Sequence, residues 1–250
     1  MLGQTTGHRL EALEPHDRTR GFCPEVMSTM HDTLDAAVHA THEVLAERLR
    51  KASAAFTTAT GRRDVYRLTD TFLASTSMHL AAVNAVLLPA AKKHLPDGPA
   101  HVRAVVRQCR RLELALSQTK ARLYGESHAI HRLWEDVWQH VGSEFEANIQ
   151  LERALVDGLI DHLDTVALDR LATRIYRTEL RSPTRPHPYT PHTGLSGRVS
   201  RRAWASADRF WDVAEGRMVP EPVRAQGPSR NGPVALPGDA SSVGSPATEG

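Results

Sequence analysis

The stretch from Ser127 to Leu163 restricts the possible fold more than any other part of the chain. It contains no proline, and its apolar residues recur at steps of three and four, which is the period of one face of an α-helix. The residues on this apolar stripe are Trp134, Val137, Val141, Phe145 and Ile149. A long helix with one apolar stripe buries that stripe against other helices. The stretch therefore predicts a helical protein in which this segment packs against partner helices.

Three further segments show the same helical period, at about residues 24–59, 64–94 and 99–124. Glycine or proline separates them, as is typical of helix ends. Aromatic residues make up only 5% of the chain, and alternating β-branched runs are scarce, which argues against a sheet. Four long amphipathic helices joined by short turns favour an antiparallel up-down-up-down four-helix bundle. The predicted fold class is all-α, with this bundle over residues 25–180, where a short helical stretch from about residue 165 continues it after a kink.

The character of the chain changes after residue 180. Residues 182–197 contain four prolines and are predicted to form an extended connector. Residues 198–215 have the period of one more amphipathic helix, so the C-terminal unit spans residues 181–220. We expect this helix to leave its arginines in water and to pack on the bundle through one apolar face, formed by Val199, Ala203, Phe210 and Trp211. Residues 1–24 and 221–250 lack periodicity and are predicted to be disordered.

The overall composition excludes several classes of function. Lys plus Arg number 31 against 29 Asp plus Glu, so the chain as a whole gives no strong signal for nucleic acid or a membrane. Positive charge dominates only between Arg170 and Arg230, which contain twelve arginines and five acidic residues. The two cysteines, Cys23 and Cys109, cannot form a disulfide framework. Without the apolar core of a signal peptide or a run of membrane-span length, the sequence predicts a cytoplasmic protein. It also lacks a phosphate-cradling glycine loop and a nucleophile elbow, and we expect no enzyme.

Histidines and acidic residues interrupt the apolar stripes of all four long helices. These residues are His42, His79, Glu113, His140 and Glu144. A charged group among Leu and Val costs roughly several kcal/mol unless it is paired or bound to a metal. Metal sites in helix bundles are built from such inward-facing histidines and carboxylates. The sequence therefore predicts that the five residues converge on one site, which is either a metal centre or a hydrogen-bonded polar core.

Other histidines compete for these roles. They are expected to lie at the surface or near the bundle end, and they are His39, His128, His131, His187 and His192. His131 stands four residues before Glu135 and so forms a second His-x-x-x-Glu pattern beside that of His140 and Glu144.

Residues 25–165 resemble the hemerythrin-like (HHE cation-binding) family. The resemblance rests on HEVLAERL from His42, on SMHLAAVNAVLLPAA around His79 and on QHVGSEFE around His140. The segment RPHPYTPHTGLSGRVSRRAWASADRFWDVAEGR also resembles the C-terminal extension of a group of actinobacterial members. The resemblance implies a four-helix bundle that holds an oxo-bridged non-haem di-iron centre, which binds or senses dioxygen.

The chain departs from the family pattern at two helices. The family has His-x-x-x-Glu on the second helix, where His79 is followed by Val83, and His-x-x-x-His on the third, which here has Glu113 and Ser117. The remaining three histidines and two glutamates could hold one iron ion, or two with water filling the gaps. The expectation is thus a non-haem iron protein that senses or handles oxygen or reactive oxygen species. The alternative is a metal-free helical module whose basic tail docks an acidic partner or an anionic surface.

Overall fold

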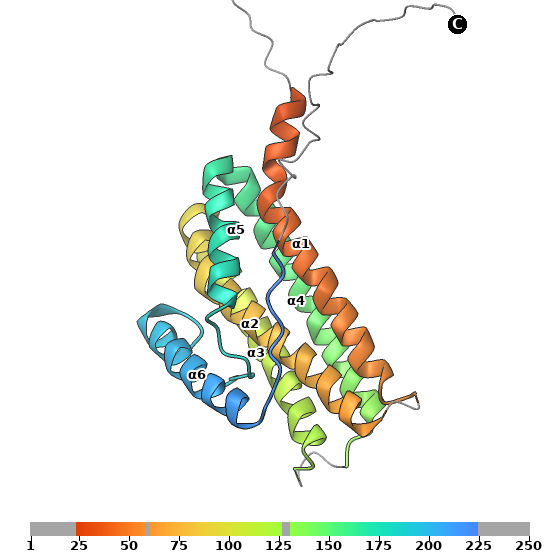
Figure 1. Cartoon of the computed structure of the whole chain (residues 1–250). Coiled ribbons are helices and arrows are strands. Elements are labelled where there is room, and N and C mark those ends of the chain that lie inside the picture. Colours follow the sequence, from red (N-terminus) through yellow and green to blue (C-terminus); the bar gives the residue numbers. More distant parts are fainter. Residues whose placement is uncertain (1–23, 59–60, 127–130, 225–250) are drawn as a thin grey trace, which may run out of the picture.

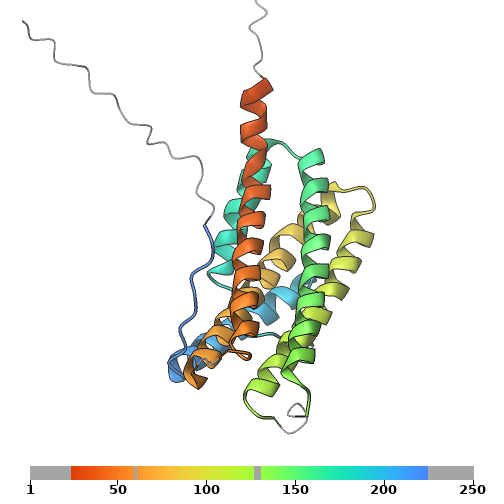
Figure 2. The ribbon, with the colours of Figure 1, turned by 90° about the vertical axis from the view of Figure 1, so that its right-hand side faces the viewer.

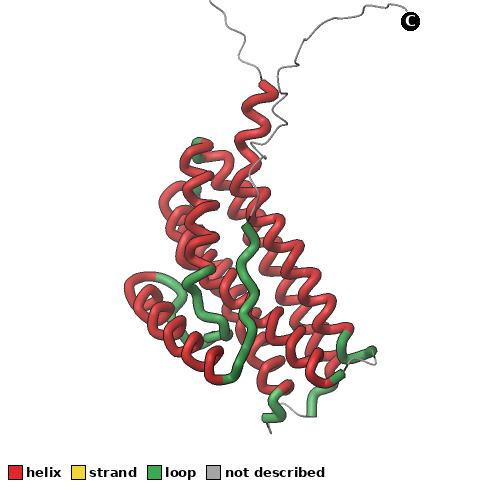
Figure 3. Tube along the Cα trace, viewed as in Figure 1, coloured by secondary structure: helices red, strands yellow, loops and turns green. Residues whose placement is uncertain are grey.

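In a computed structural model, the described residues (24–58, 61–126 and 131–224) form six α-helices and no strand, as Figure 3 shows. The helices are α1 (Pro24–Ala54), α2 (Arg62–His94), α3 (Gly98–Leu123), α4 (Trp134–His162), α5 (Thr165–Glu179) and α6 (Gly194–Ala214). The predicted all-α class is confirmed. The segments predicted to be disordered lie almost entirely outside the described residues, although Pro24 already belongs to α1.

Helix α2 lies at the centre of the structure, where it contacts α1, α3, α4 and α5 (Figure 1). Its residues between Thr69 and Ala91 are small or apolar around nearly the whole circumference, and most of them are buried, as expected for a helix enclosed by others. By length and composition alone α2 could also cross a membrane, but most of that stretch is buried inside the protein. It is therefore the core helix of this fold.

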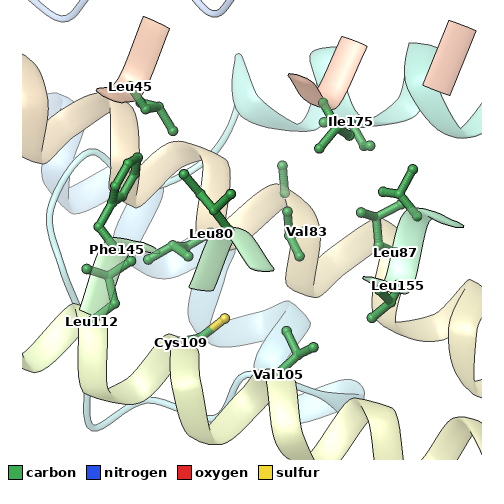
Figure 4. Close-up of a cluster of buried hydrophobic side chains, with 14 of the residues drawn as sticks. Leu45, Leu80, Val83, Leu87, Val105, Cys109, Leu112, Phe145, Leu155 and Ile175 are labelled. Atoms are coloured by element: carbon green, nitrogen blue, oxygen red, sulfur yellow. The ribbon is translucent and has the colours of Figure 1, made fainter. Parts of the chain in front are cut away.

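The hydrophobic core forms where α1, α3, α4 and α5 surround α2. Figure 4 shows Leu80, Val83 and Leu87 of α2 among buried side chains from the other helices. The apolar stripe predicted for α4 is buried from Val137 to Ile149. The helix itself begins at Trp134, whose half-buried ring lies 3.9 Å from that of Phe56. The period of three and four thus identified the core face of α4.

Helix α5 is a separate helix that packs against α1 and α2. Asp164 begins it, since the Asp164 carboxylate accepts a hydrogen bond from the backbone N–H of Ala167 at 2.7 Å, which is the usual role of an N-cap aspartate. Its buried positions are Leu168, Leu171, Ala172, Ile175 and Glu179. The packing of α5 therefore places an acidic residue, Glu179, in the core.

Helix α6 turns a different face inward from the one predicted. Its buried residues are Gly197, Ala205, Asp208 and Asp212, whereas the predicted packing residues Val199, Ala203, Phe210 and Trp211 are exposed. The acidic face is turned inward because Asp208 accepts hydrogen bonds from the backbone amides of Thr184 and Arg185 at 2.9 and 3.0 Å. Gly197 allows this close approach, because a Cβ atom there would lie 2.9 Å from the carbonyl oxygen of Pro191.

Candidate metal centre

One group of three ligand-type side chains meets in the core of the described structure. It consists of His42 of α1, His79 of α2 and Glu152 of α4, and one ligand atom of each lies within 4.8 Å of the others. All three side chains are at most 3% exposed. Each comes from a different helix of the core, so helix packing rather than a local motif brings them together.

Both histidines point at the same carboxylate oxygen. Glu152 Oε2 lies 2.7 Å from His42 Nε2 and 3.0 Å from His79 Nε2. The two imidazole rings stand nearly perpendicular, at 88° with centroids 5.3 Å apart. One oxygen of Glu152 therefore lies between two imidazole nitrogens in a site with almost no solvent exposure.

A second layer of polar side chains orients this group. The Nδ1 atom of His79 lies 2.7 Å from Glu179 Oε1, the acid at the end of α5. On the other side, the amide of Asn148 donates a hydrogen bond to Glu152 Oε1 at 2.5 Å. Cys109 Sγ in turn contacts Asn148 Oδ1 at 3.6 Å. His79 and Glu152 are thus each fixed by a partner on the atom that faces away from the shared oxygen.

The pKa values of His79 and Glu152 are shifted by burial and by the charged groups beside them. Burial alone would lower the pKa of His79, but the charges and hydrogen bonds of Glu152 and Glu179 raise it to about 10. Burial likewise opposes ionisation of Glu152, yet His79 and His42 hold the pKa of that carboxyl well below its usual value. Without a metal, the centre is therefore a protonated His79 held between two carboxylates.

The donor set fits one first-row metal ion. Two imidazole nitrogens and a carboxylate oxygen are the ligands of many mononuclear iron sites. A carboxylate on the far nitrogen of a ligating histidine, as Glu179 is on His79, fixes the ring and raises its basicity. Among the described residues, the buried Nδ1 of His42 has no hydrogen-bond partner, so no such support for this ring is seen there. The described residues offer no second group of three that could hold another ion.

The structure brings together only two of the five residues predicted for the site, His42 and His79. Glu144 instead accepts hydrogen bonds from Gln108 at 2.7 Å and Arg111 at 3.2 Å on the outer side of α3 and α4. His140 is half-buried one turn before it on the same side of α4. At about 100° per residue, Glu144 and His140 lie roughly 80° and 120° around the helix from Glu152. The rotation of α4 therefore places Glu152 beside the two histidines, and neither Glu144 nor His140 lies there.

Glu113 also lies apart from the centre, in a second buried polar cluster. Its Oε2 atom is 3.4 Å from Nε2 of His192, a residue of the proline-rich connector, and Asn84 Nδ2 is 3.3 Å from the Nδ1 atom of the same ring. Burial raises the pKa of Glu113 to about 8 against the opposite effect of Arg110. Burial and the nearby Arg110 and Arg201 lower the pKa of His192 to about 4. Glu113 thus lies against the connector rather than at the centre, and its Oε2 atom has no hydrogen-bond partner among the described residues.

The competing histidines lie away from the centre. His39 is exposed, 3.3 Å from Glu43, and His131 is exposed just before α4 begins. His187 stacks on Trp204 with ring centroids 4.3 Å apart. His128 falls outside the described residues.

Sequence reasoning missed Glu152 and Glu179, although both carried the signal that singled out Glu113. Glu152 lies three residues after Ile149 and four before Val156, in the middle of an apolar stripe, and Glu179 lies four after Ile175. An acidic residue at a core position of a helix is a strong indication of a buried partner.

Comparisons of this chain with protein-family models, with curated proteins and with solved structures found no match.

Proposed function

We propose that this protein binds one non-haem metal ion, iron in the first place, through His42, His79 and Glu152. The observation that carries the proposal is the convergence of two histidine Nε2 atoms on one oxygen of Glu152 in a buried site. His42, His79 and Glu152 would hold a ferrous ion through three donor atoms, and such an ion would supply the chemistry for binding dioxygen. The proposed role is therefore to sense or handle oxygen or reactive oxygen species rather than to catalyse a reaction.

The proposal includes a hemerythrin-like bundle made of α1 to α4. Contacts of α1 with α2 and α4, and of α3 with α2 and α4, favour it. In Figures 1 and 2 the colours run along successive long helices in opposite directions, which supports an up-down-up-down bundle. The centre we propose differs from the family's di-iron centre because Val83 and Ser117 replace ligands and because Glu113 and Glu144 have other partners.

The chain's own residues would do three things at this centre. His42, His79 and Glu152 would supply the donor atoms, while Glu179 and Asn148 would orient them. Binding of a cation would release the proton that His79 Nε2 shares with Glu152, since a ligating nitrogen must be deprotonated. Affinity should therefore fall as the pH is lowered.

Metal analysis of untagged protein tests this proposal. Chelator-stripped protein is reconstituted with Fe(II) without air, and separately with Co(II), and excess ion is removed. We expect about one ion per chain in the wild type, and large losses in Glu152→Gln and in His42→Gln, as expected for loss of one of three ligands. His140→Ala and Glu144→Gln are matched controls, because they remove the apparent His-x-x-x-Glu motif outside the centre.

Two results would contradict the proposal. One is wild-type protein that keeps no ion although circular dichroism shows it to be folded. The other is a control variant that loses as much metal as Glu152→Gln, since the ligands would then lie elsewhere on α4.

A further inference from the structure

The solvent-facing side of α6 carries an exposed apolar stripe. Its residues are Leu195, Val199, Phe210 and Val213, which are 74, 62, 68 and 84% exposed. Their spacing places them along one line of the helix. α6 lies at the outer edge of the structure in Figure 1, on the side away from α1 and α4. Large apolar side chains gathered on one exposed face mark an interaction surface more often than scattered ones do.

Arginines border this stripe and continue into a groove between α5 and α6. The groove has a volume of about 300 Å³ and is lined by six arginines, with Thr178 and Ser182 among its other residues. The six are Arg174, Arg177, Arg181, Arg198, Arg201 and Arg202. Arg198 and Arg202 belong to both features, since they lie on α6 one turn apart beside Val199. The arginine groove and the apolar stripe are therefore parts of one continuous surface.

The acidic residues of this region are used elsewhere. Glu179 is turned to His79, and Asp208 and Asp212 bind Thr184 and Arg185 of the connector. Glu215 pairs with Arg185. Within the described part of the chain, none of the six groove arginines pairs with a carboxylate, and only Arg201 donates a hydrogen bond, to the carbonyl of His192 at 3.0 Å. Like charges this close repel one another, and an anionic ligand would relieve that repulsion.

We propose that this surface, formed by α6 and the end of α5, docks on a membrane that contains anionic phospholipids. The arginines would bind lipid phosphates, and the apolar stripe would enter the boundary between headgroups and acyl chains. A helix with aromatic and aliphatic residues on one face and arginines at its border is the usual design for such binding. Nucleic acid or a free phosphate compound would account for the arginines but would leave the apolar stripe in water. The inference does not depend on the metal centre.

Sedimentation of the full-length protein with vesicles tests this surface. We expect binding to vesicles of phosphatidylcholine with about a third phosphatidylglycerol, and little binding to phosphatidylcholine alone. Arg198→Gln with Arg202→Gln should weaken binding roughly 30-fold, on the basis of the usual contribution of one arginine near an anionic surface. Arg107→Gln with Arg153→Gln is the matched control, because it removes the same charge from exposed positions on α3 and α4 and should bind as the wild type does.

A second variant separates membrane insertion from simple charge attraction. Phe210→Ser with Val213→Ser keeps every arginine but removes half of the stripe, and it too should bind phosphatidylglycerol vesicles several-fold more weakly, since each buried apolar group contributes to interfacial binding. The proposal is overturned if the groove variant and its control bind alike, or if Phe210→Ser with Val213→Ser binds as the wild type does. It is also overturned if inorganic phosphate or duplex DNA binds the wild type while the vesicles do not.

Discussion

Glu152→Gln should destabilise the metal-free protein more than any other single change in the centre. Glu152 is fully buried, and its two oxygens have three partners, His42, His79 and Asn148. Glutamine has nearly the same shape but no charge, and it must place either its oxygen or its NH2 group toward the two imidazoles. If the oxygen faces them, the NH2 group of the new side chain meets the NH2 group of Asn148, so one hydrogen bond is lost in either arrangement.

The loss of stability can be worked out from the partners that Glu152 has in the structure. Removing the charge leaves His79 protonated beside Glu179 alone, and breaking one side of a buried ion pair costs about 3–5 kcal/mol. Some of this is recovered because the pKa of His79 can then fall and because glutamine still accepts one hydrogen bond of about 1 kcal/mol. We therefore expect a loss of about 3 kcal/mol in the free energy of unfolding, which lowers the Tm of a chain of this size by roughly 6–12 °C.

Thermal unfolding at neutral pH in the presence of a chelator measures this loss. Glu144→Gln is the control, because the Glu144 side chain still reaches solvent (17% exposed) and its partner Arg111 is exposed, so loss of this charge should cost less than about 1 kcal/mol. A Glu152→Gln protein that melts within about 2 °C of this control would refute the reasoning, since the shared carboxylate would then contribute no more than a surface ion pair.

Four further outcomes can be checked. Because the pKa of His79 is raised from 6.5 to about 10, the contribution of this group to the stability of the metal-free protein should be fully present below pH 6.5 and should be lost as the pH rises through 10, and His79→Gln should flatten this slope in urea titrations. Because the pKa of Glu113 is raised from 4.5 to about 8, Glu113→Gln should raise the Tm at about pH 9 but not at about pH 4. Asp208→Ala should lower the free energy of unfolding by about 2–5 kcal/mol. It should also speed hydrogen exchange of the backbone amides of Thr184 and Arg185, which donate to Asp208. Cys109, whose thiol pKa is raised by burial, should be inert to thiol reagents in folded Cys23→Ser protein and should react in urea.

The helices and their core faces could be predicted because periodicity is a local property. The stripe of α4 from Val137 to Ile149 is buried as expected, since apolar residues at helical spacing can only be removed from water together. His42 and His79 were found for the same reason, because each interrupts such a stripe. Proposals about fold class and core positions therefore followed directly from residue spacing.

The exact composition of the centre depends on the rotation of α4, which the His-x-x-x-Glu motif does not determine. Glu144 and Glu152 lie on the same helix, roughly 80° apart, and either could face the two histidines. A recognisable His-x-x-x-Glu spacing favoured Glu144, whereas packing of the whole stripe turns Glu152 inward. In the sequence, the continuation of the apolar stripe beyond Ile149 indicated that Glu152 faces inward, whereas the His-x-x-x-Glu motif did not.

The orientation of α6 was not predictable from its amphipathic pattern alone. The pattern distinguishes an apolar from a polar face, and burial of the apolar face is normally favoured. Here the polar face contains Asp208 and Asp212, which accept backbone and side-chain hydrogen bonds from the connector more than twenty residues earlier. These long-range partners decide which face turns inward, and they leave Phe210 and Trp211 in water.

The connector also changes what the resemblance implies for the third helix. Glu113 stands where the family pattern places a ligand, and in this chain it lies 3.4 Å from His192 of the connector, beside Asn84. Val83, at another ligand position, is fully buried and belongs to the hydrophobic core. An ion at these positions would have to displace His192, and with it the segment that Asp208 and Asp212 fasten to α6. Val83 therefore offers no donor atom, and Glu113 lies beside the connector rather than in the group of His42, His79 and Glu152.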